Sequence, residues 1–182
     1  MKALIKSKFT LLVFTSLFIS FQMQSQEASL DKKQKSEIKV DVFDLAVFTA
    51  LEVTYEKLKD DESGYGLTLY LNFRSEDTFY EKFALTTFYR FYFLNGKDYG
   101  AKGFFAESFL KYSSGENFEI DFYNSENTNY SDLSLGFAIG RKWVSKKGFT
   151  METSIGIGRN FGLDKNSPDF AIRGGISLGY RF

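Results

Sequence analysis

The sequence predicts an all-β protein, an eight-stranded antiparallel up-and-down barrel that crosses a membrane. From Ile38 to the end of the chain, apolar residues recur at every second position, which is the period of a half-buried strand, and no segment shows a helical stripe. Aromatic residues make up 19% of the chain, and they favour strands and membrane interfaces. Proline occurs once, at Pro168, so few backbone ladders are interrupted.

The beginning of the chain has the layout of a secretory signal peptide. In residues 1–26, three lysines precede an apolar run at 9–21, which is too short to span a bilayer as a helix. Residues 27–37 are charged and show no periodicity, so we expect a disordered leader there. This division assigns 38–182 to the barrel.

The first part of the barrel is predicted to contain two strands. Residues 38–58 contain no glycine or proline, and fully extended they would be about 70 Å long at ~3.3 Å per residue, roughly twice what a tilted membrane strand requires. We therefore divide this segment at Phe48 and Thr49. The turn sequence KDDESG at 59–64 ends the second strand.

Six further segments alternate between bulky apolar residues and small or polar ones. They cover 66–74, 83–93, 104–112, 133–140, 149–158 and 170–182. Strands of about ten residues are long enough to cross an apolar band of ~25 Å at a steep tilt. With the N-terminus in the periplasm, the long polar connections at 113–131 and 159–169 would be extracellular loops, and the turns at 59–64, 95–103 and 144–148 would be periplasmic.

Alternation alone does not show which face of the strands points outward, because a soluble barrel alternates in the same way. The volume of the barrel interior decides between the two arrangements. The interior of an eight-stranded barrel is only just wide enough for its side chains, so the Leu, Phe and Ile residues of all the strands would overfill it. We therefore expect the bulky face to contact lipid. Charged residues on the other face must be paired to be tolerated in the interior. We predict a structural ion-pair cluster that fills the lumen, formed by Glu52, Glu56, Arg90, Glu107, Lys111, Lys142, Glu152, Arg173 and Arg181.

The composition argues against catalysis and nucleic-acid binding. Histidine and cysteine are both absent, so the usual general base and the commonest zinc ligand are missing, and we expect no enzyme, cofactor or metal. Removal of 1–26 leaves 20 basic and 23 acidic side chains, a net charge of −3, which gives no footprint for nucleic acid. The segment 113–131 contains acidic residues without Lys or Arg and is open to a calcium ion or a cationic partner, although a solvated loop is the simpler interpretation.

The end of the chain resembles the C-terminal assembly signal of Gram-negative outer-membrane barrels. The last strand alternates apolar residues and ends in Gly179, Tyr180, Arg181 and Phe182. Further stretches, among them EIKVDVFDLAVFTALEVTYEK and RKWVSKKGFTMETSIGIGRNFG, resemble a family of small outer-membrane barrels of unknown function, eight-stranded like the barrel of outer-membrane protein A. The resemblance implies the fold, the outer membrane and recognition of Tyr180 and Phe182 by the assembly machinery, and it supplies no active site.

Three functional hypotheses follow. The first is an integral outer-membrane barrel, exported through a cleaved signal peptide, with a plugged polar lumen and a structural or surface-interaction role in the cell envelope. Its partners would be outer-membrane lipid, the assembly machinery and an extracellular partner bound through 113–131. The alternatives are a narrow porin-like channel and a soluble secreted barrel that binds an apolar ligand.

Overall fold

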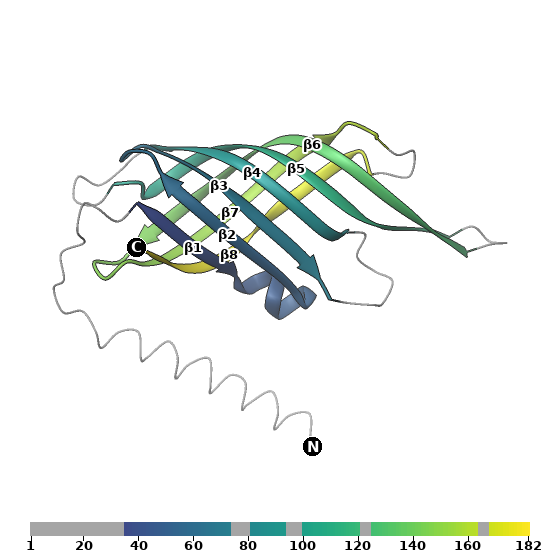
Figure 1. The fold of residues 1–182 in the computed structure, drawn as a ribbon, viewed down its shortest axis with the longest axis horizontal. Coiled ribbons are helices and arrows are strands. Elements are labelled where there is room, and N and C mark those ends of the chain that lie inside the picture. Colours follow the sequence, from purple (N-terminus) through teal and green to yellow (C-terminus); the bar gives the residue numbers. More distant parts are fainter. Residues whose placement is uncertain (1–34, 74–80, 94–99, 121–124, 164–167) are drawn as a thin grey trace, which may run out of the picture.

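The chain forms a closed antiparallel barrel in which consecutive strands pair and β8 pairs with β1 (Figure 1). The structure is a computed structural model that describes residues 35–73, 81–93, 100–120, 125–163 and 168–182, with the backbone alone at 117–120 and 125–128. The elements are β1 (Ser36–Asp41), η1 (Asp44–Phe48), β2 (Ala50–Leu58), β3 (Ser63–Asn72), β4 (Glu81–Phe93), β5 (Gly103–Ile120), β6 (Ser125–Val144), β7 (Phe149–Asn160) and β8 (Phe170–Arg181). The predicted all-β, eight-stranded antiparallel barrel is confirmed.

Only the end of the expected leader lies within the described residues. The proposed signal peptide, 1–26, lies outside them. Ser36 and Glu37, which we assigned to the leader, belong to β1 and pair with β2. The barrel therefore begins earlier than predicted, because Glu37 alternates with Ile38 as the first inward-facing residue of the wall.

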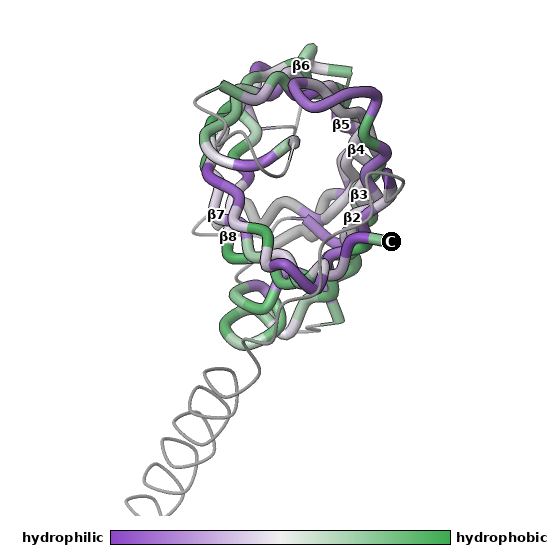
Figure 2. The backbone as a smooth tube through the Cα atoms, turned by 90° about the vertical axis from the view of Figure 1, so that its left-hand side faces the viewer, coloured by the Kyte–Doolittle hydropathy of each residue, from purple (hydrophilic) through white to green (hydrophobic). Residues whose placement is uncertain are grey.

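Bulky apolar side chains point outward from every strand, as the volume argument predicts. In β5, Phe105 and Phe109 are buried, whereas their neighbours Phe104 and Leu110 are each 42% exposed. Each strand contributes to the outer apolar surface, for example through Ile38, Tyr55, Leu67, Leu85, Leu110, Phe137, Ile157 and Ile172. The end-on view in Figure 2 shows the ring of strands with η1 lying outside it.

The first strand is shorter than predicted, and a helical segment replaces its second half. β1 stops at Asp41, whose Oδ1 accepts the backbone N–H groups of Phe43 at 2.8 Å and Asp44 at 2.9 Å. A side chain that satisfies the first N–H groups in this way favours the start of a helical turn. Thr49, with a φ of 56°, then returns the chain to β2. The predicted split at Phe48 and Thr49 gives the correct start of β2, but the first strand does not extend to it.

The polar segment 113–131 is mainly strand, and the expected loop is wrong. β5 and β6 stay paired from Gly103 opposite Lys142 to Ile120 opposite Ser125, so they form a long hairpin that extends beyond the other strands (Figure 1). Backbone hydrogen bonds between two antiparallel strands require no apolar face. Polar residues on both faces therefore removed the alternating signal without preventing the pairing.

The two ends of the barrel differ in their connections. The start of β1, the C-terminus and the three connections β2–β3, β4–β5 and β6–β7 lie at one end, which we call the terminal end (Figure 1). The predicted turns all fall here. In the first of them, Asp60 accepts hydrogen bonds from the backbone N–H of Glu62 and the hydroxyl of Ser63, which lower the pKa of its carboxyl. We call the other end, which carries η1 and the β5–β6 hairpin, the hairpin end.

Aromatic rings and glycines fit together on the inner face of the wall. Phe105 and Phe109 of β5 lie against Gly140 and Gly136 of β6, where an added Cβ would overlap each ring. The glycines on the inner face therefore provide space for large neighbours in addition to keeping the lumen narrow. This packing adds aromatic residues to an interior that we expected to hold mostly small residues and ions.

Candidate functional site

The terminal half of the lumen contains a network of ion pairs centred on Glu56. Its carboxylate accepts hydrogen bonds from Lys39 Nζ and Lys142 Nζ, each at 2.7 Å, and from Arg90 Nη1 at 3.0 Å. The hydroxyl of Tyr92 also donates to it. Glu56 has no solvent-exposed surface, so these four donors replace water entirely.

Arg90 connects Glu56 to two further carboxylates. Its Nη1 donates to Glu152 at 2.7 Å and its Nε to Glu107 at 2.5 Å. Arg173 donates to the other oxygen of Glu107 at 2.7 Å. One guanidinium thus joins side chains from β2, β5 and β7 across the barrel. A lysine ammonium would fix the directions of these hydrogen bonds less well, because it is a point charge and lacks the planar array of N–H donors.

Aromatic rings on both sides hold the guanidinium of Arg90 in place. Its central carbon lies 4.5 Å from the ring centroid of Phe88 and 4.3 Å from that of Phe105. The ammonium of Lys142 lies 4.7 Å from the ring of Tyr92. Such cation–π contacts stabilise desolvated cations, so the aromatic residues of the lumen support the ion pairs as well as filling space.

The connection between β4 and β5 folds over the terminal end of this network. Arg181 donates from Nε to Glu37 at 2.7 Å, and its terminal nitrogens donate to the carbonyl oxygens of Gly100 at 2.7 Å and Ala101 at 2.8 Å. Ala101 is fully buried. The connection at 100–102 therefore closes the mouth of the barrel, which explains why it is longer than a simple turn.

The charges of this network balance. We call the following ten residues the lumen network: Glu37, Glu52, Glu56, Glu107, Glu152, Lys39, Arg90, Lys142, Arg173 and Arg181. Every member has an opposite charge within 4.0 Å, and most of the side chains are at most 5% exposed. A water-filled pore at this level would expose them, so the lumen is filled here.

The structure brings eight of the nine predicted cluster residues into the lumen network. Glu52 is at its edge, 4.0 Å from Arg173. The ninth, Lys111, lies nearer the hairpin end and pairs with Glu81 at 2.7 Å. Glu37 and Lys39 were missed, although their alternation with Ile38 and Val40 is the signal that would have found them.

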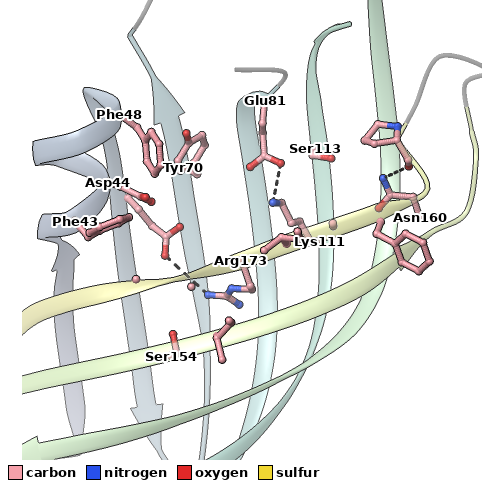
Figure 3. A pocket seen from close by; sticks show the side chains of 18 of the residues that line it. Phe43, Asp44, Phe48, Tyr70, Glu81, Lys111, Ser113, Ser154, Asn160 and Arg173 are labelled. Carbon is pink, nitrogen blue, oxygen red and sulfur yellow. Dashed lines mark hydrogen bonds and ion pairs between the residues drawn. The ribbon is translucent and has the colours of Figure 1, made fainter. Parts of the chain in front are cut away.

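A cavity of about 710 Å³ occupies the hairpin half of the lumen (Figure 3). Its wall includes Phe43 and Phe48 from the η1 segment, Tyr70 from β3, Lys111 from β5 and Arg173 from β8. The lining from the strands includes the small residues Ser113 and Ser154 together with the larger Tyr130.

Carboxylates outnumber free cations around the cavity. Lys111 is paired with Glu81 (Figure 3). Arg173 is paired with Glu107. Asp44 is only 8% exposed, and it has no ion-pair partner within 4.0 Å among the described residues. The cavity therefore combines aromatic walls with an acidic polar region.

The structure describes the predicted acidic segment at 113–131 only in part. In the acidic segment, Glu116 pairs with Lys82 at 2.6 Å on the surface, and the side chains of Glu119, Asp121 and Glu126 lie outside the described residues. Within the described part of the chain, no group of three or more acidic residues is arranged to hold a metal ion.

The residues of the expected assembly signal lie on the outer surface. Tyr180 is 48% and Phe182 54% exposed at the terminal end, so both are accessible from outside the barrel. Their recognition by the assembly machinery remains a prediction.

The fold and its surface define a class: an eight-stranded closed barrel with an apolar exterior and a charged interior. The chain is similar to the N-terminal β-barrel domain of Pseudomonas aeruginosa OprF, known from its crystal structure, with a TM-score of 0.51 and 15% sequence identity over 82% of this chain and 98% of that one. The predicted resemblance to eight-stranded outer-membrane barrels is confirmed at the level of the fold. No family model and no curated protein matches the sequence. In the described ranges, no helix has the length and hydropathy needed to cross a bilayer.

Proposed function

We propose that this chain is an integral outer-membrane barrel with a plugged lumen, which has a structural or surface-interaction role in the cell envelope and no catalytic activity. The observation that carries the proposal is the combination of an apolar exterior on all strands with a buried, charge-balanced lumen network. In water such an exterior would be a large aggregation-prone surface, whereas in lipid it is favourable. The similarity to the OprF barrel domain supports the same assignment.

The filled terminal half argues for a plug over a porin-like channel. An ion crossing the barrel would have to pass Glu56 and Arg90, whose side chains are fully buried and saturated with partners. Displacing one partner of a buried pair costs about 3–5 kcal/mol. The cost opposes steady ion flow, so the lumen network is better suited to holding the strands together than to conducting.

The long β5–β6 hairpin is the element best placed for surface interactions. With the terminal end in the periplasm, the hairpin projects outside the cell beyond the other strands (Figure 1). The proposed partners are outer-membrane lipid, the assembly machinery and an extracellular partner that binds this hairpin.

Membrane association and ion conductance test the proposal. The protein should partition with outer membranes, resist extraction by carbonate and migrate faster on gels before heating than after, because the intact barrel is compact. In planar bilayers it should show no ion conductance, whereas Arg90→Ser, which removes the side chain at the centre of the network, provides a variant in which leak is detectable. Extraction into buffer without detergent would contradict the membrane assignment, and steady conductance by the parent protein would contradict the plug.

A further inference from the structure

The wall of the barrel is incomplete at the hairpin half of β8. Because β1 is short, its pairing with β8 covers only residues 177–181 of the described chain, and residues 170–176 pair with β7 alone. η1 occupies the place of the missing strand but bulges outside the ring (Figure 2). We call the gap between η1 and residues 170–176 the lateral opening.

The cavity passes through this opening. Its wall includes every residue of β8 from Phe170 to Ile176, so it contacts both the inward-facing Arg173 and the outward-facing Ile172 and Ile176. Successive residues of a strand point to opposite faces. The cavity contacts both faces of β8 along its free edge, and Ser154 and Ile155 of β7 beside that edge also line it, which indicates that the lumen is continuous with the outer surface of the barrel here.

The lateral opening is built into the structure by specific residues. Asp41 ends β1 by accepting the N–H groups of Phe43 and Asp44, and its second oxygen accepts a hydrogen bond from Ser177 at 3.1 Å. Gly175 provides the necessary space, because a side chain there would overlap the Asp41 carboxylate. Unpaired strand edges are not found in contact with hydrocarbon unless they line a cavity or are covered by protein. The edge of β8 therefore requires an occupied or hydrated cavity beside it.

The chemistry of the cavity selects its occupant. Phe43, Phe48, Phe170 and Ile172 offer an apolar surface, and a volume of about 710 Å³ lies in the range of about 300–1,000 Å³ that holds drug-sized ligands. Both cations of the wall are already paired, at 2.7 Å in each case, whereas the buried Asp44 carboxylate forms no ion pair within 4.0 Å in the described structure, and Lys111 acts on it only from a longer distance. An unpaired buried carboxylate favours a ligand that carries a cationic group, and it disfavours a ligand whose only charge is negative, such as a fatty acid.

We propose that the lateral opening admits, from the surrounding lipid, an amphiphile that carries a protonated primary amine. The alkyl chain lies against η1 and β8, and the ammonium group binds Asp44, with Glu52 as the second carboxylate. The entry route depends on the proposed membrane location, but the binding chemistry does not. The amine belongs either to the headgroup of a membrane lipid or to a free alkylamine.

Binding is measured by titrating the folded, detergent-purified full chain with dodecylamine in a calorimeter, with dodecanoate and dodecanol as ligands of the same chain length. Dodecylamine should bind saturably with one molecule per chain and at least tenfold more tightly than the other two. Equal binding of dodecanoate, or no saturable binding of dodecylamine, would overturn the proposal. Folding is checked by heat-dependent mobility, so a failure of binding is distinguished from a failure of the barrel assignment.

Variants assign the binding to Asp44. Asp44→Asn should weaken dodecylamine at least tenfold, because it removes the charge and keeps the shape, whereas Asp60→Asn, in an exposed turn at the other end, should leave it unchanged. If Asp44→Asn does not fold, Glu52→Gln serves as the second variant and should weaken binding severalfold. Unchanged affinity in every folded variant of the two carboxylates would overturn the assignment.

The source of the amine is tested with vesicles. After reconstitution in phosphatidylethanolamine and return to detergent, retention of that lipid and its displacement by dodecylamine would support a lipid headgroup. Absence of retained lipid, with dodecylamine still bound, would support a free alkylamine.

Discussion

Replacing the central carboxylate of the lumen network tests whether the network holds the barrel together. In Glu56→Gln, the ammonium groups of Lys39 and Lys142 and the guanidinium of Arg90 lose an ionised partner that lies 2.7–3.0 Å away. Each cation keeps at least one other carboxylate within 3.0 Å. The loss therefore corresponds to one broken buried pair, about 3–5 kcal/mol of unfolding free energy.

Urea unfolding in lipid vesicles measures this loss. The sole tryptophan, Trp143, lies 40% exposed on the outer surface, so its fluorescence reports when the wall leaves the lipid. A matched control is Glu116→Gln, which breaks a pair of 2.6 Å with Lys82 between side chains that are 38% and 49% exposed. An exposed pair contributes about 0–1 kcal/mol. If Glu56→Gln unfolds within about 1 kcal/mol of the parent, as the control should, the lumen network is not a source of stability, and the argument for a structural plug fails.

Three further outcomes follow from the structure. Gly136→Ala should destabilise the barrel by about 1–3 kcal/mol in the same urea assay, because the new Cβ overlaps the ring of Phe109, and a second change, Phe109→Leu, should recover part of the loss. Asp41→Ala should cost about 1 kcal/mol through loss of the bonds that start η1, and should raise hydrogen exchange at Phe43 and Asp44. Asp60→Ala should lower the urea midpoint at pH 6. Folding lowers the pKa of the Asp60 carboxyl, so the ionised carboxylate stabilises the fold above the ordinary Asp pKa of 3.8, and this stabilisation is lost in acid. The difference in urea midpoint between variant and parent should therefore narrow as the pH falls below 3.8. A constant difference across this range would contradict the assigned hydrogen bonds.

The barrel and the direction of its faces were predictable because both follow from local rules. Period-two alternation defines strands wherever one face is apolar, and the limited volume of an eight-stranded interior determines which face is outside. The same reasoning identified most of the lumen network, since a charge on the inner face must find a partner. It could not assign the partners, which depend on barrel register: Arg90 and Glu107 lie directly opposite in β4 and β5, but Glu152 reaches Arg90 from across the lumen.

The η1 segment could not be predicted from its pattern. Phe43, Leu45 and Val47 still alternate with Asp44 and Ala46, on the opposite parity from Ile38 and Val40, so the sequence resembles a strand with a one-residue shift after Val42. β1 ends at Asp41, whose carboxylate accepts hydrogen bonds from the backbone N–H groups of Phe43 and Asp44 and from the hydroxyl of Ser177 on β8. Ser177 is a tertiary partner more than one hundred residues away, and no local rule includes it.

The shortness of β1 explains why one lumen has two different halves. The inward-facing positions of β1 end with Asp41, so only Glu37 and Lys39 contribute to the filled terminal half, and β1 adds no side chain to the hairpin half. There the wall includes small polar residues such as Ser113 and Ser154. A continuation of β1 beyond its six residues would pair with the free edge of β8, and its inward side chains would reduce the cavity. The filled terminal half and the open cavity of the hairpin half therefore have the same structural origin, because β1 ends at Asp41.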